Sequence, residues 1–362
     1  MRLCMIAPVP PPYGGISNWY LLCKEYIECS LPNVEMITIN IAPAKRSTEG
    51  RNIWDRVIGG GFDLIIKQKA LRRLIKRDKP DIIHMTTSGE LALIRDIVLL
   101  KTAKARGIPT VYHIRFGRIP KISGKNTLEW KLIKKAMSLS SLTIAIDFRT
   151  FSTIKEKAPD VSVSLIPNPI DFSKLPPLEK NRNNEIVFLG WIIKTKGVEE
   201  LIKAWNAVGR EYSDYLLNII GPGNDEYIKS LKQKCTVPNV CFSGELAHEK
   251  AINLISQCCI FILPSYTEGF PNAVLEAMAL GRPIIACDVG AIPDMLSGDC
   301  GITIKSKSSK EIENALKTML ESPEKAAIFG EKARSKAFSE YSVNRVFEKY
   351  LNAWSEVSGV LI

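Results

Sequence analysis

The chain has 362 residues, of which 46% are hydrophobic and 24% are charged, so it is long enough for about two globular domains. This composition excludes wholesale disorder, collagen-like sequence and a small disulfide-stabilised protein. No apolar run reaches the ~18 residues of a membrane-spanning helix, and the first apolar run is too short for a signal peptide. We therefore expect a cytoplasmic protein.

The net charge of +11 points to an anionic partner, for which nucleic acid, anionic lipid and phosphorylated small molecules all qualify. The chain contains no recognisable nucleic-acid motif, so we expect no nucleic-acid partner. Its 9 cysteines include no Cys-x-x-Cys pair, and their odd number without an export signal indicates reduced thiols. Because the 3 histidines are far apart and no Asp-x-Asp occurs, we expect neither a metal nor another cofactor.

Short apolar runs alternate with helical patterns along the whole chain. The expected strands of the first half are Leu3–Ala7, Val34–Asn40, Asp81–Met85, Thr110–Ile114, Leu142–Ile146 and Ser162–Ile166. Those of the second half are Glu185–Leu189, Tyr215–Ile220, Val240–Ser243, Ile260–Leu263, Pro283–Ala286 and Gly301–Ile304. Helical spacing between these runs, as in Leu91–Ala105 and Val198–Val208, predicts βαβ units and parallel sheets.

A polar segment with two prolines and no hydrophobic period, residues 171–184, predicts a domain boundary. We expect an N-terminal Rossmann-like domain over 1–172, a linker over 173–184 and a second Rossmann-like domain over 185–340. A C-terminal helix follows over 341–362, and packing back on the first domain is one arrangement for it. The predicted class is α/β, with two doubly wound domains facing across a deep cleft. Ligands of such sheets bind beyond the carboxyl ends of the strands.

A first candidate ligand loop lies between the first strand and the helical pattern that starts near Ser17. Its glycine pair, Gly14 and Gly15, would let the backbone approach a ligand, and the helix N-terminus that follows favours an anion. The segment is neither a dinucleotide fingerprint nor a Walker sequence. A tight turn without any ligand would need the same glycines.

A more specific pattern follows the strand that ends at Leu263. Glu268 lies in the loop after that strand, and a helix runs from Asn272 to Leu280, with Gly281 as its stop. Free N–H groups at the helix start suit a diphosphate, and Glu276, four residues after Asn272, could accept two hydrogen bonds from a ribose diol. The alternative for Glu276 is an ordinary surface position on the helix.

The segment Pro264-Ser265-Tyr266-Thr267-Glu268-Gly269-Phe270-Pro271-Asn272 with Glu276 resembles family 4 of the glycosyltransferases, which have the GT-B fold. The other segments that match the family in order are Gly14-Gly15, Asp81-Ile82-Ile83-His84, His113, Ile166-Pro167-Asn168-Pro169-Ile170-Asp171, Gly190 with Lys196-Gly197, and Ile220-Gly221-Pro222-Gly223. The resemblance spans nearly the whole chain, is dense from 186 to 300 and is thin from 42 to 140.

The resemblance implies a retaining, metal-independent transferase that uses a nucleoside diphosphate sugar, and we expect a UDP-sugar. The implied acceptor is a saccharide or a lipid-linked acceptor in bacterial surface polysaccharide or glycolipid assembly. The resemblance also implies that the N-terminal domain, 1–172, binds the acceptor and that the C-terminal domain, 185–340, binds the nucleotide sugar. The implied catalytic residues are Glu268, His113 and Lys196. The implied donor-binding residues are Gly14, Gly15, Gly190, Gly221, Pro222, Glu245, Leu246, Gly269, Phe270, Pro271, Asn272 and Glu276, and none binds a metal.

One residue departs from the family pattern. The position after Gly190, which usually holds an arginine paired with the later lysine, is Trp191 here. Either Lys194 or Arg115 then supplies, beside Lys196, the second positive charge that neutralises the diphosphate, or Lys196 neutralises it alone. A catalytically silent GT-B subunit of a polysaccharide assembly complex, with Trp191 as the mark of lost activity, is the alternative function. Within the fold, the nearest alternative is a sugar phosphorylase or a nucleotide-sugar epimerase. A phosphorylase is less well supported, because no lysine is a candidate for pyridoxal phosphate.

Two basic stretches of the first half, Leu64 to Arg77 and Lys121 to Lys135, interleave apolar residues with lysine and arginine. Such a pattern is typical of an interfacial helix, so an anionic membrane surface is a further candidate partner and a peripheral location on the inner face of the cell membrane is a candidate localisation. The alternative is that both apolar stripes pack on the first sheet while the lysines face water. The remaining histidines, His84 and His248, are interpreted as structural.

Overall fold

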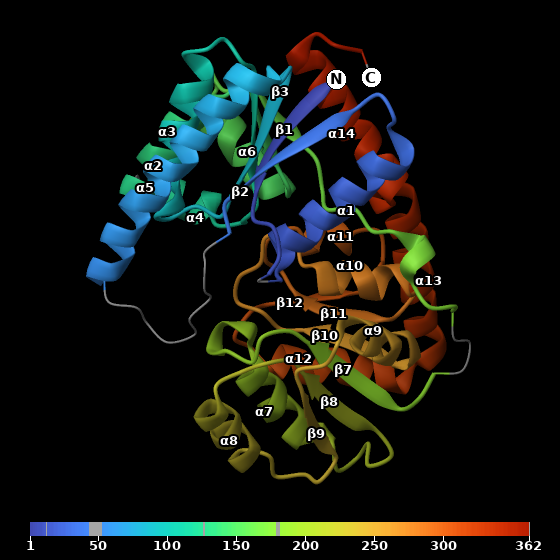
Figure 1. The fold of residues 1–362 in the computed structure, drawn as a ribbon. Coiled ribbons are helices and arrows are strands. Elements are labelled where there is room, and N and C mark those ends of the chain that lie inside the picture. Colours follow the sequence, from blue (N-terminus) through green and yellow to red (C-terminus); the bar gives the residue numbers. More distant parts are fainter. Residues whose placement is uncertain (12, 43–52, 126, 179–181, 362) are drawn as a thin grey trace. The chain divides into compact units, whose positions relative to one another are not determined.

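A computed structural model describes residues 1–11, 13–42, 53–125, 127–178 and 182–361 of the chain (Figure 1). The chain divides into two compact units. Unit 1 comprises Met1–Pro167 and Phe347–Ile362, and unit 2 comprises Asn168–Val346. The predicted linker, 173–184, falls within unit 2 in this division. Its residues 179–181, like Pro12 of the glycine-containing segment, lie outside the described residues, and the predicted cleft stays a prediction.

Unit 1 is built on a six-stranded parallel sheet with the strand order β2-β1-β3-β4-β5-β6. The strands are β1 (Arg2–Ala7), β2 (Glu35–Asn40), β3 (Ile82–Thr87), β4 (Thr110–Ile114), β5 (Leu142–Ala145) and β6 (Val163–Leu165). All six predicted strands of the first half are confirmed, with ends that shift by at most two residues. The prediction succeeds because strands buried on both faces read as continuous apolar runs.

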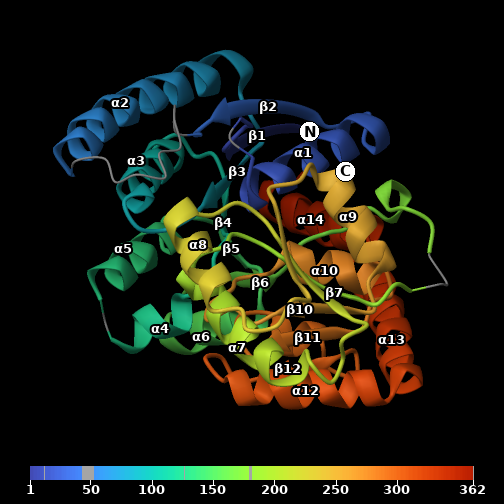
Figure 2. The same cartoon turned by 90° about the horizontal axis from the view of Figure 1, so that it is seen from below.

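The helices of unit 1 cover both faces of this sheet (Figures 1 and 2). They are α1 (Gly15–Ser30), α2 (Ile53–Asp78), α3 (Ala92–Lys104), α4 (Ile119–Gly124), α5 (Leu128–Met137), α6 (Phe148–Lys157) and the part of α14 (Val343–Ser358) that starts at Phe347. Alternation along β3 sends Ile83 and Met85 into the core beneath α2, α3 and α5. The intervening His84 points to the opposite face, where it meets side chains of α1 and α14.

Unit 2 repeats the parallel design with the strand order β12-β11-β10-β7-β8-β9. Its strands are β7 (Glu185–Leu189), β8 (Leu216–Ile220), β9 (Val240–Gly244), β10 (Ile260–Leu263), β11 (Ile284–Cys287) and β12 (Ile302–Ile304). These six strands are also confirmed. Because all run parallel, the loops that follow β7 to β11 lie along one edge of the sheet, where ligands of such sheets bind.

Helices of unit 2 pack on both faces of its sheet, with α7 against α12 on one face and α10 against α9 and α13 on the other (Figure 1). The helical segments are η1 (Phe172–Lys174), η2 (Lys194–Lys196), α7 (Val198–Val208), α8 (Asp225–Gln233), α9 (His248–Gln257), α10 (Asn272–Ala279), α11 (Ile292–Met295), α12 (Ser309–Glu321) and α13 (Pro323–Tyr341). None of the helices in the described ranges is long and apolar enough to cross a membrane.

Candidate functional site

An ion pair joins two of the predicted catalytic residues at the strand ends of unit 2. Lys196, the last residue of η2, places its Nζ 2.5 Å from Oε1 of Glu268 in the loop after β10. The two side chains are only 22% and 11% exposed, so the pair is screened little by water. A backbone hydrogen bond from Tyr266 N–H to the Thr195 carbonyl, at 2.8 Å, ties the same two loops together.

Two glycines allow these loops to approach each other. Gly197 has a φ of 70°, and a Cβ at this position would lie 2.1 Å from the carbonyl oxygen of Pro264. Gly290 has a φ of 58°, and a Cβ there would lie about as close to the backbone of Glu268 and Gly269, at 2.5 and 2.4 Å. Any side chain would force the backbone apart, so both positions require glycine. The sequence analysis missed Gly290, because nothing local links it to a loop 21 residues earlier.

Helix α10 starts beside this ion pair, and its amino end is held by an asparagine from the start of unit 2. Asn168 Nδ2 donates to the Asn272 side chain at 2.8 Å and to the Phe270 carbonyl at 3.3 Å. The first turn of α10, residues 272–275, contains no acid, and its N-cap Pro271 makes no side-chain cap. Free backbone N–H groups therefore remain at a helix end with partial positive charge, which favours an anion.

The predicted loops after β7, β8 and β9 also meet at this edge. Gly221, with a φ of 143°, packs so tightly on Gly190 that a Cβ would lie 1.9 Å from the Gly190 oxygen. Its N–H donates to the Gly244 carbonyl at 2.8 Å, and the Ile192 N–H donates to the Pro222 carbonyl at 2.7 Å. The loop continues from Gly244 through Glu245, which is exposed, and Leu246, which is half-buried. Five of the implied donor-binding positions, Gly190, Gly221, Pro222, Glu245 and Leu246, thus lie on linked loops.

Glu276, the residue predicted to bind the ribose, lies on α10 and contacts a histidine that the sequence analysis interpreted as structural. His248 Nε2 is 3.0 Å from Glu276 Oε1, and the hydrogen bond with this carboxylate raises the pKa of His248. His248 is the first residue of α9, directly after the Gly244–Ala247 loop. The His248 side chain is 65% exposed, and its interpretation as a structural histidine stays a prediction. The missed contact joins two helices that start 24 residues apart.

The departure from the family pattern, Trp191, is exposed at 42% in the loop between β7 and η2. At this exposure, Trp191 is not packed in the core of unit 2. Lys194, a candidate for the second cation, is also exposed and lies two residues before Lys196 in η2.

Unit 1 contains the remaining predicted site residues. Gly14 and Gly15 lie where β1 leads into α1, and a Cβ at Gly15 would meet nothing within 4 Å, so a ligand has room there. His113, at the carboxyl end of β4, is fully buried instead of lying open to a ligand. Its ring packs on Trp19 at 5.1 Å between centroids and on Tyr350 at 5.8 Å. The catalytic role implied for His113 is therefore restricted to the Nε2 edge of its ring, which faces Arg115.

Burial also determines the protonation states of His84, His113 and Arg115. It lowers the pKa of His84 to about 3, and it lowers the pKa of His113 well below the usual 6.5, so both rings are neutral at pH 7. Burial lowers the pKa of Arg115 to about 10, which leaves this side chain charged, and its guanidinium lies 4.8 Å from the centre of the Trp19 ring. A cation therefore lies against the edge of a neutral histidine.

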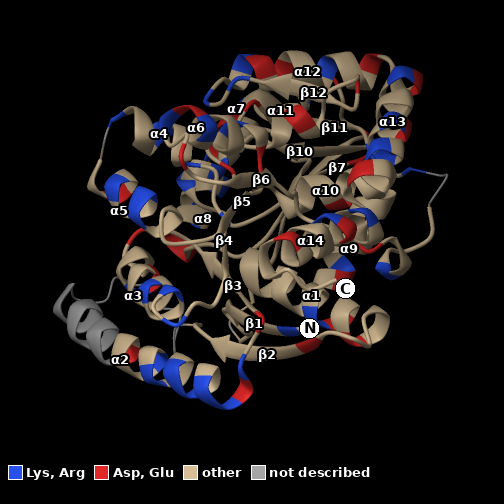
Figure 3. Ribbon diagram, turned by 90° about the horizontal axis from the view of Figure 1, so that it is seen from above, with Lys and Arg blue, Asp and Glu red and all other residues tan. Residues whose placement is uncertain are grey.

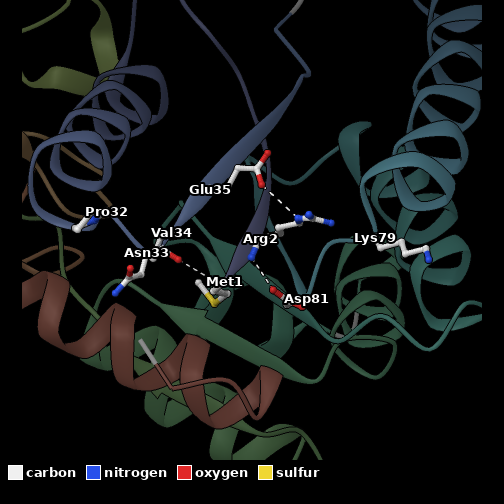
Figure 4. A pocket seen from close by; sticks show the side chains of 8 residues that line it. All are labelled: Met1, Arg2, Pro32, Asn33, Val34, Glu35, Lys79 and Asp81. Atoms are coloured by element: carbon white, nitrogen blue, oxygen red, sulfur yellow. Dashed lines mark hydrogen bonds and ion pairs between the residues drawn. The ribbon is translucent and has the colours of Figure 1, made fainter.

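A pocket of about 360 Å³ in unit 1 lies away from these residues, at the amino ends of the strands (Figure 4). Its polar groups pair with one another. Arg2 forms an ion pair with Glu35 at 3.2 Å, and the Arg2 N–H donates to Asp81 at 2.6 Å. Because parallel sheets bind ligands at the opposite, carboxyl edge, this pocket is no candidate for the substrate.

Comparison with curated proteins finds relatives that are named glycosyltransferases. An uncharacterized glycosyltransferase of Haemophilus influenzae is 26% identical over 208 residues, which cover 54% of this chain and 56% of the relative. The putative teichuronic acid biosynthesis glycosyltransferase TuaC of Bacillus subtilis is 23% identical over 269 residues, 69% of this chain and 64% of that protein. The chain thus spans between about half and two thirds of the length of these relatives.

Solved structures match over nearly the full length. Sucrose-phosphate synthase from Thermosynechococcus elongatus has a TM-score of 0.80 at 15% identity, with 99% of both chains covered. HepE from Anabaena in complex with UDP has a TM-score of 0.75 at 17% identity and covers 98% of this chain and 100% of its own. These likenesses establish the fold, and they confirm the predicted GT-B class of two Rossmann-like units.

The family profile described as "Glycosyl transferases group 1" matches residues 170–336, which are nearly all of unit 2. This range contains the Lys196–Glu268 ion pair and the amino end of α10. The match agrees with the resemblance that the motifs of the second half carry. Residues 170–336 are thus similar to the glycosyl transferases group 1, and the chain has the GT-B fold.

Proposed function

We propose that this protein is a retaining, metal-independent glycosyltransferase that moves a sugar from a UDP-sugar to a saccharide or lipid-linked acceptor. The acceptor belongs to bacterial surface polysaccharide or glycolipid assembly. The teichuronic acid transferase among the relatives and the UDP in HepE support this choice of acceptor class and donor nucleotide.

The observation that carries the proposal is the placement of Lys196 and Glu268 beside the amino end of α10. A departing nucleoside diphosphate develops negative charge, and a cation and a helix N-terminus that are already in position stabilise that charge. Glu268, which pairs with the ammonium group of Lys196, also accepts hydrogen bonds from the hydroxyls of the donor sugar in this proposal. Glu276, farther along α10, takes the ribose.

The linked glycine loops after β7, β8 and β9 supply the surface for the base. Gly190, Gly221 and Gly244 bring three backbones within hydrogen-bonding distance, and none of them carries a Cβ that would block a flat ring. We propose that the Glu245–Leu246 turn flanks the base on one side, next to the His248–Glu276 contact.

The acceptor side of the proposal involves a membrane. In unit 1, α2 presents exposed Lys69, Arg72, Arg73 and Lys76, and its exposed Ile65 and Ile66 are each about half accessible, at 51% and 54%. Cations beside exposed apolar residues favour an anionic lipid surface. We therefore propose that unit 1 docks peripherally on such a surface, where a lipid-linked acceptor is presented.

A panel of nucleotide sugars tests the proposal. Purified protein is screened by thermal shift for binding and by release of free nucleotide for donor hydrolysis. We expect a UDP-sugar to raise the unfolding temperature, because a ligand that binds only the folded chain stabilises it, and to be hydrolysed slowly without acceptor. Binding without hydrolysis or transfer to any acceptor would favour the silent-subunit alternative. A chain that binds no nucleotide sugar contradicts both functions.

A further inference from the structure

A row of four side chains crosses the interior of unit 1 and joins helix α14 to the end of β4. Trp354 Nε1 lies 2.9 Å from His84 Nδ1. His84 Nε2 lies 3.1 Å from His113 Nδ1, and His113 Nε2 lies 3.4 Å from a guanidinium nitrogen of Arg115. The indole and both imidazole rings are fully buried, whereas Arg115 is half-buried.

These four side chains bring more hydrogen-bond donors than acceptors to their three contacts. An indole N–H and a guanidinium only donate, and a neutral imidazole has one donor nitrogen and one acceptor nitrogen. The row therefore offers four donors and two acceptors, so one contact joins two donors and is not a hydrogen bond. Protonating a ring worsens the mismatch, because an imidazolium donates from both nitrogens.

Distance and burial show which contact lacks an acceptor. The contact of Trp354 with His84 is the shortest of the three and lies between fully buried groups, where an unmade hydrogen bond costs most. The contact of His113 with Arg115 is the longest and lies at the accessible end of the row. With Trp354 donating to Nδ1, neutral His84 carries its proton on Nε2 and donates to His113. The His113 proton is then on Nε2, and it faces the guanidinium.

We propose that Trp354 and His84 hold His113 in the Nε2–H tautomer, so that this N–H and the Arg115 guanidinium are two donors that converge on one oxygen atom of the bound substrate. Because His113 is fully buried and Arg115 is half-buried, that oxygen reaches the two donors from the Arg115 side. The substrate contact rests on the glycosyltransferase function proposed above. His113 then acts as a neutral donor and not as a general base, because His84 occupies its acceptor nitrogen. His84 and Trp354 are positioning residues, which act on the substrate only through His113.

Two substitutions of His84 separate positioning from packing. In His84→Gln, the side-chain oxygen accepts from Trp354 and the amide N–H donates to His113, so the order of donors and acceptors is kept. His84→Leu fills the space with neither group. We expect H84Q to transfer sugar within about threefold of the wild type and H84L to lose about tenfold or more, since one ordinary hydrogen bond corresponds to roughly that factor. Trp354→Phe, which keeps an aromatic ring and removes the donor, should behave like H84L.

The tautomer is read by ¹⁵N NMR of the imidazole nitrogens in the full chain, a measurement that needs no turnover. In the wild type and H84Q, we expect a protonated Nε2 on His113 that shifts when UDP-glucose is added. H84L and W354F should show a mixture of both tautomers. A wild type with the proton on Nδ1 overturns the proposal, and so does an H84L protein with wild-type tautomer and rate.

Two further outcomes separate this inference from the function on which it rests. A nucleotide sugar that binds without moving the His113 Nε2 signal overturns the substrate contact. A chain that binds none of the nucleotide sugars overturns the proposed function and, with it, the substrate contact. The tautomer measurement on H84Q and H84L would then still decide whether His84 and Trp354 orient His113.

Discussion

Lys196 and Glu268 are 72 residues apart in the chain, yet their side chains form an ion pair that is largely removed from water. In such surroundings the attraction between charges is strong, but so is the cost of leaving one charge without its partner. A group held in this way also loses little freedom when a diphosphate arrives, because its orientation is already set. The pair is therefore suited to electrostatic stabilisation that requires no rearrangement.

Replacing either member of this pair should abolish most of the activity. We expect Lys196→Ala and Glu268→Gln each to lower turnover by at least ~100-fold, as the loss of a preorganised electrostatic contact does. Lys203→Ala, which removes an exposed lysine of α7, is the matched control and should leave turnover near the wild-type value. Initial rates at saturating donor and circular dichroism of each variant are the measurements. Near-normal rates in both site variants would contradict the site assignment.

The buried histidines of unit 1 predict how stability depends on pH. Their pKa values are lowered in the folded chain, to about 3 for His84 and well below 6.5 for His113, so the unfolded chain binds protons that the folded chain does not. The contribution of these two histidines to stability is therefore complete above pH 6.5, and it is lost as the pH falls below this value. At pH 5 each histidine should cost about 2 kcal/mol of unfolding free energy.

Urea unfolding between pH 8 and pH 5 measures this loss. His84→Gln should show a smaller decline than the wild type, because one of the two buried histidines no longer titrates. His248→Asn should not reduce the decline, since the raised pKa of His248 acts in the opposite sense, with stability lost as the pH rises. An H84Q protein as acid-sensitive as the wild type would contradict this account.

Among the elements, α2 shows how one helix serves two environments. Its Leu71, Leu74 and Ile75 are buried in the core of unit 1, as the structural alternative for this stretch predicted. Figure 3 marks the lysine and arginine positions of α2, of which Lys69, Arg72, Arg73, Lys76 and Arg77 are exposed. Two cations of the helix have acidic neighbours, since Lys67, which is half-buried, lies 3.6 Å from Asp63 and Arg77 is paired with Asp78. The second basic stretch behaves alike, since its Trp130 and Ile133 are buried. Core packing thus explains most of the apolar residues in these two stretches. It does not explain the excess of cations, which remain available to bind an anionic partner.

Liposome co-sedimentation tests the partner proposed for α2. Binding should require anionic lipid, weaken as salt screens the charges, and drop when Arg72, Arg73, Lys76 and Arg77 become Ser, because each cation near an anionic surface contributes about 1 kcal/mol. The charge-matched control replaces exposed lysines of unit 2, namely Lys229, Lys232, Lys325 and Lys332, with Ser. Equal binding to neutral vesicles, or equal loss in the control, would exclude docking through α2.

Strands and ligand-bearing loops could be predicted from the sequence because their signals are local. An apolar run between polar turns identifies β10, and the Glu-Gly-Phe-Pro-Asn segment behind it identifies the loop with Glu268 and the start of α10. The contacts that assemble the site are not local. Gly290 against Glu268, Asn168 against Asn272 and His248 against Glu276 join segments that only the fold brings together, so no periodicity or spacing could reveal them.

For the whole molecule, we expect activity without a divalent metal. Within the described ranges, no three His, Cys, Asp or Glu side chains are grouped as a metal ion would require, and Lys196 with the α10 amino end is the proposed counter-charge for the diphosphate. Transfer should therefore persist after dialysis against excess EDTA. Complete loss of transfer that magnesium or manganese restores would contradict the metal-independent mechanism.

Helix α14 starts among the last residues of unit 2 and supplies unit 1 with Phe347–Ile362, including Tyr350 and Trp354. During synthesis, residues 1–167 emerge first, but the helix that covers the His84 and His113 face emerges only after the roughly 180 residues of unit 2. At ordinary elongation rates this delay is on the order of 10–40 s. During this delay Trp19, His84 and His113 are not covered by α14. Chaperones would therefore bind this protein while the chain is still attached to the ribosome.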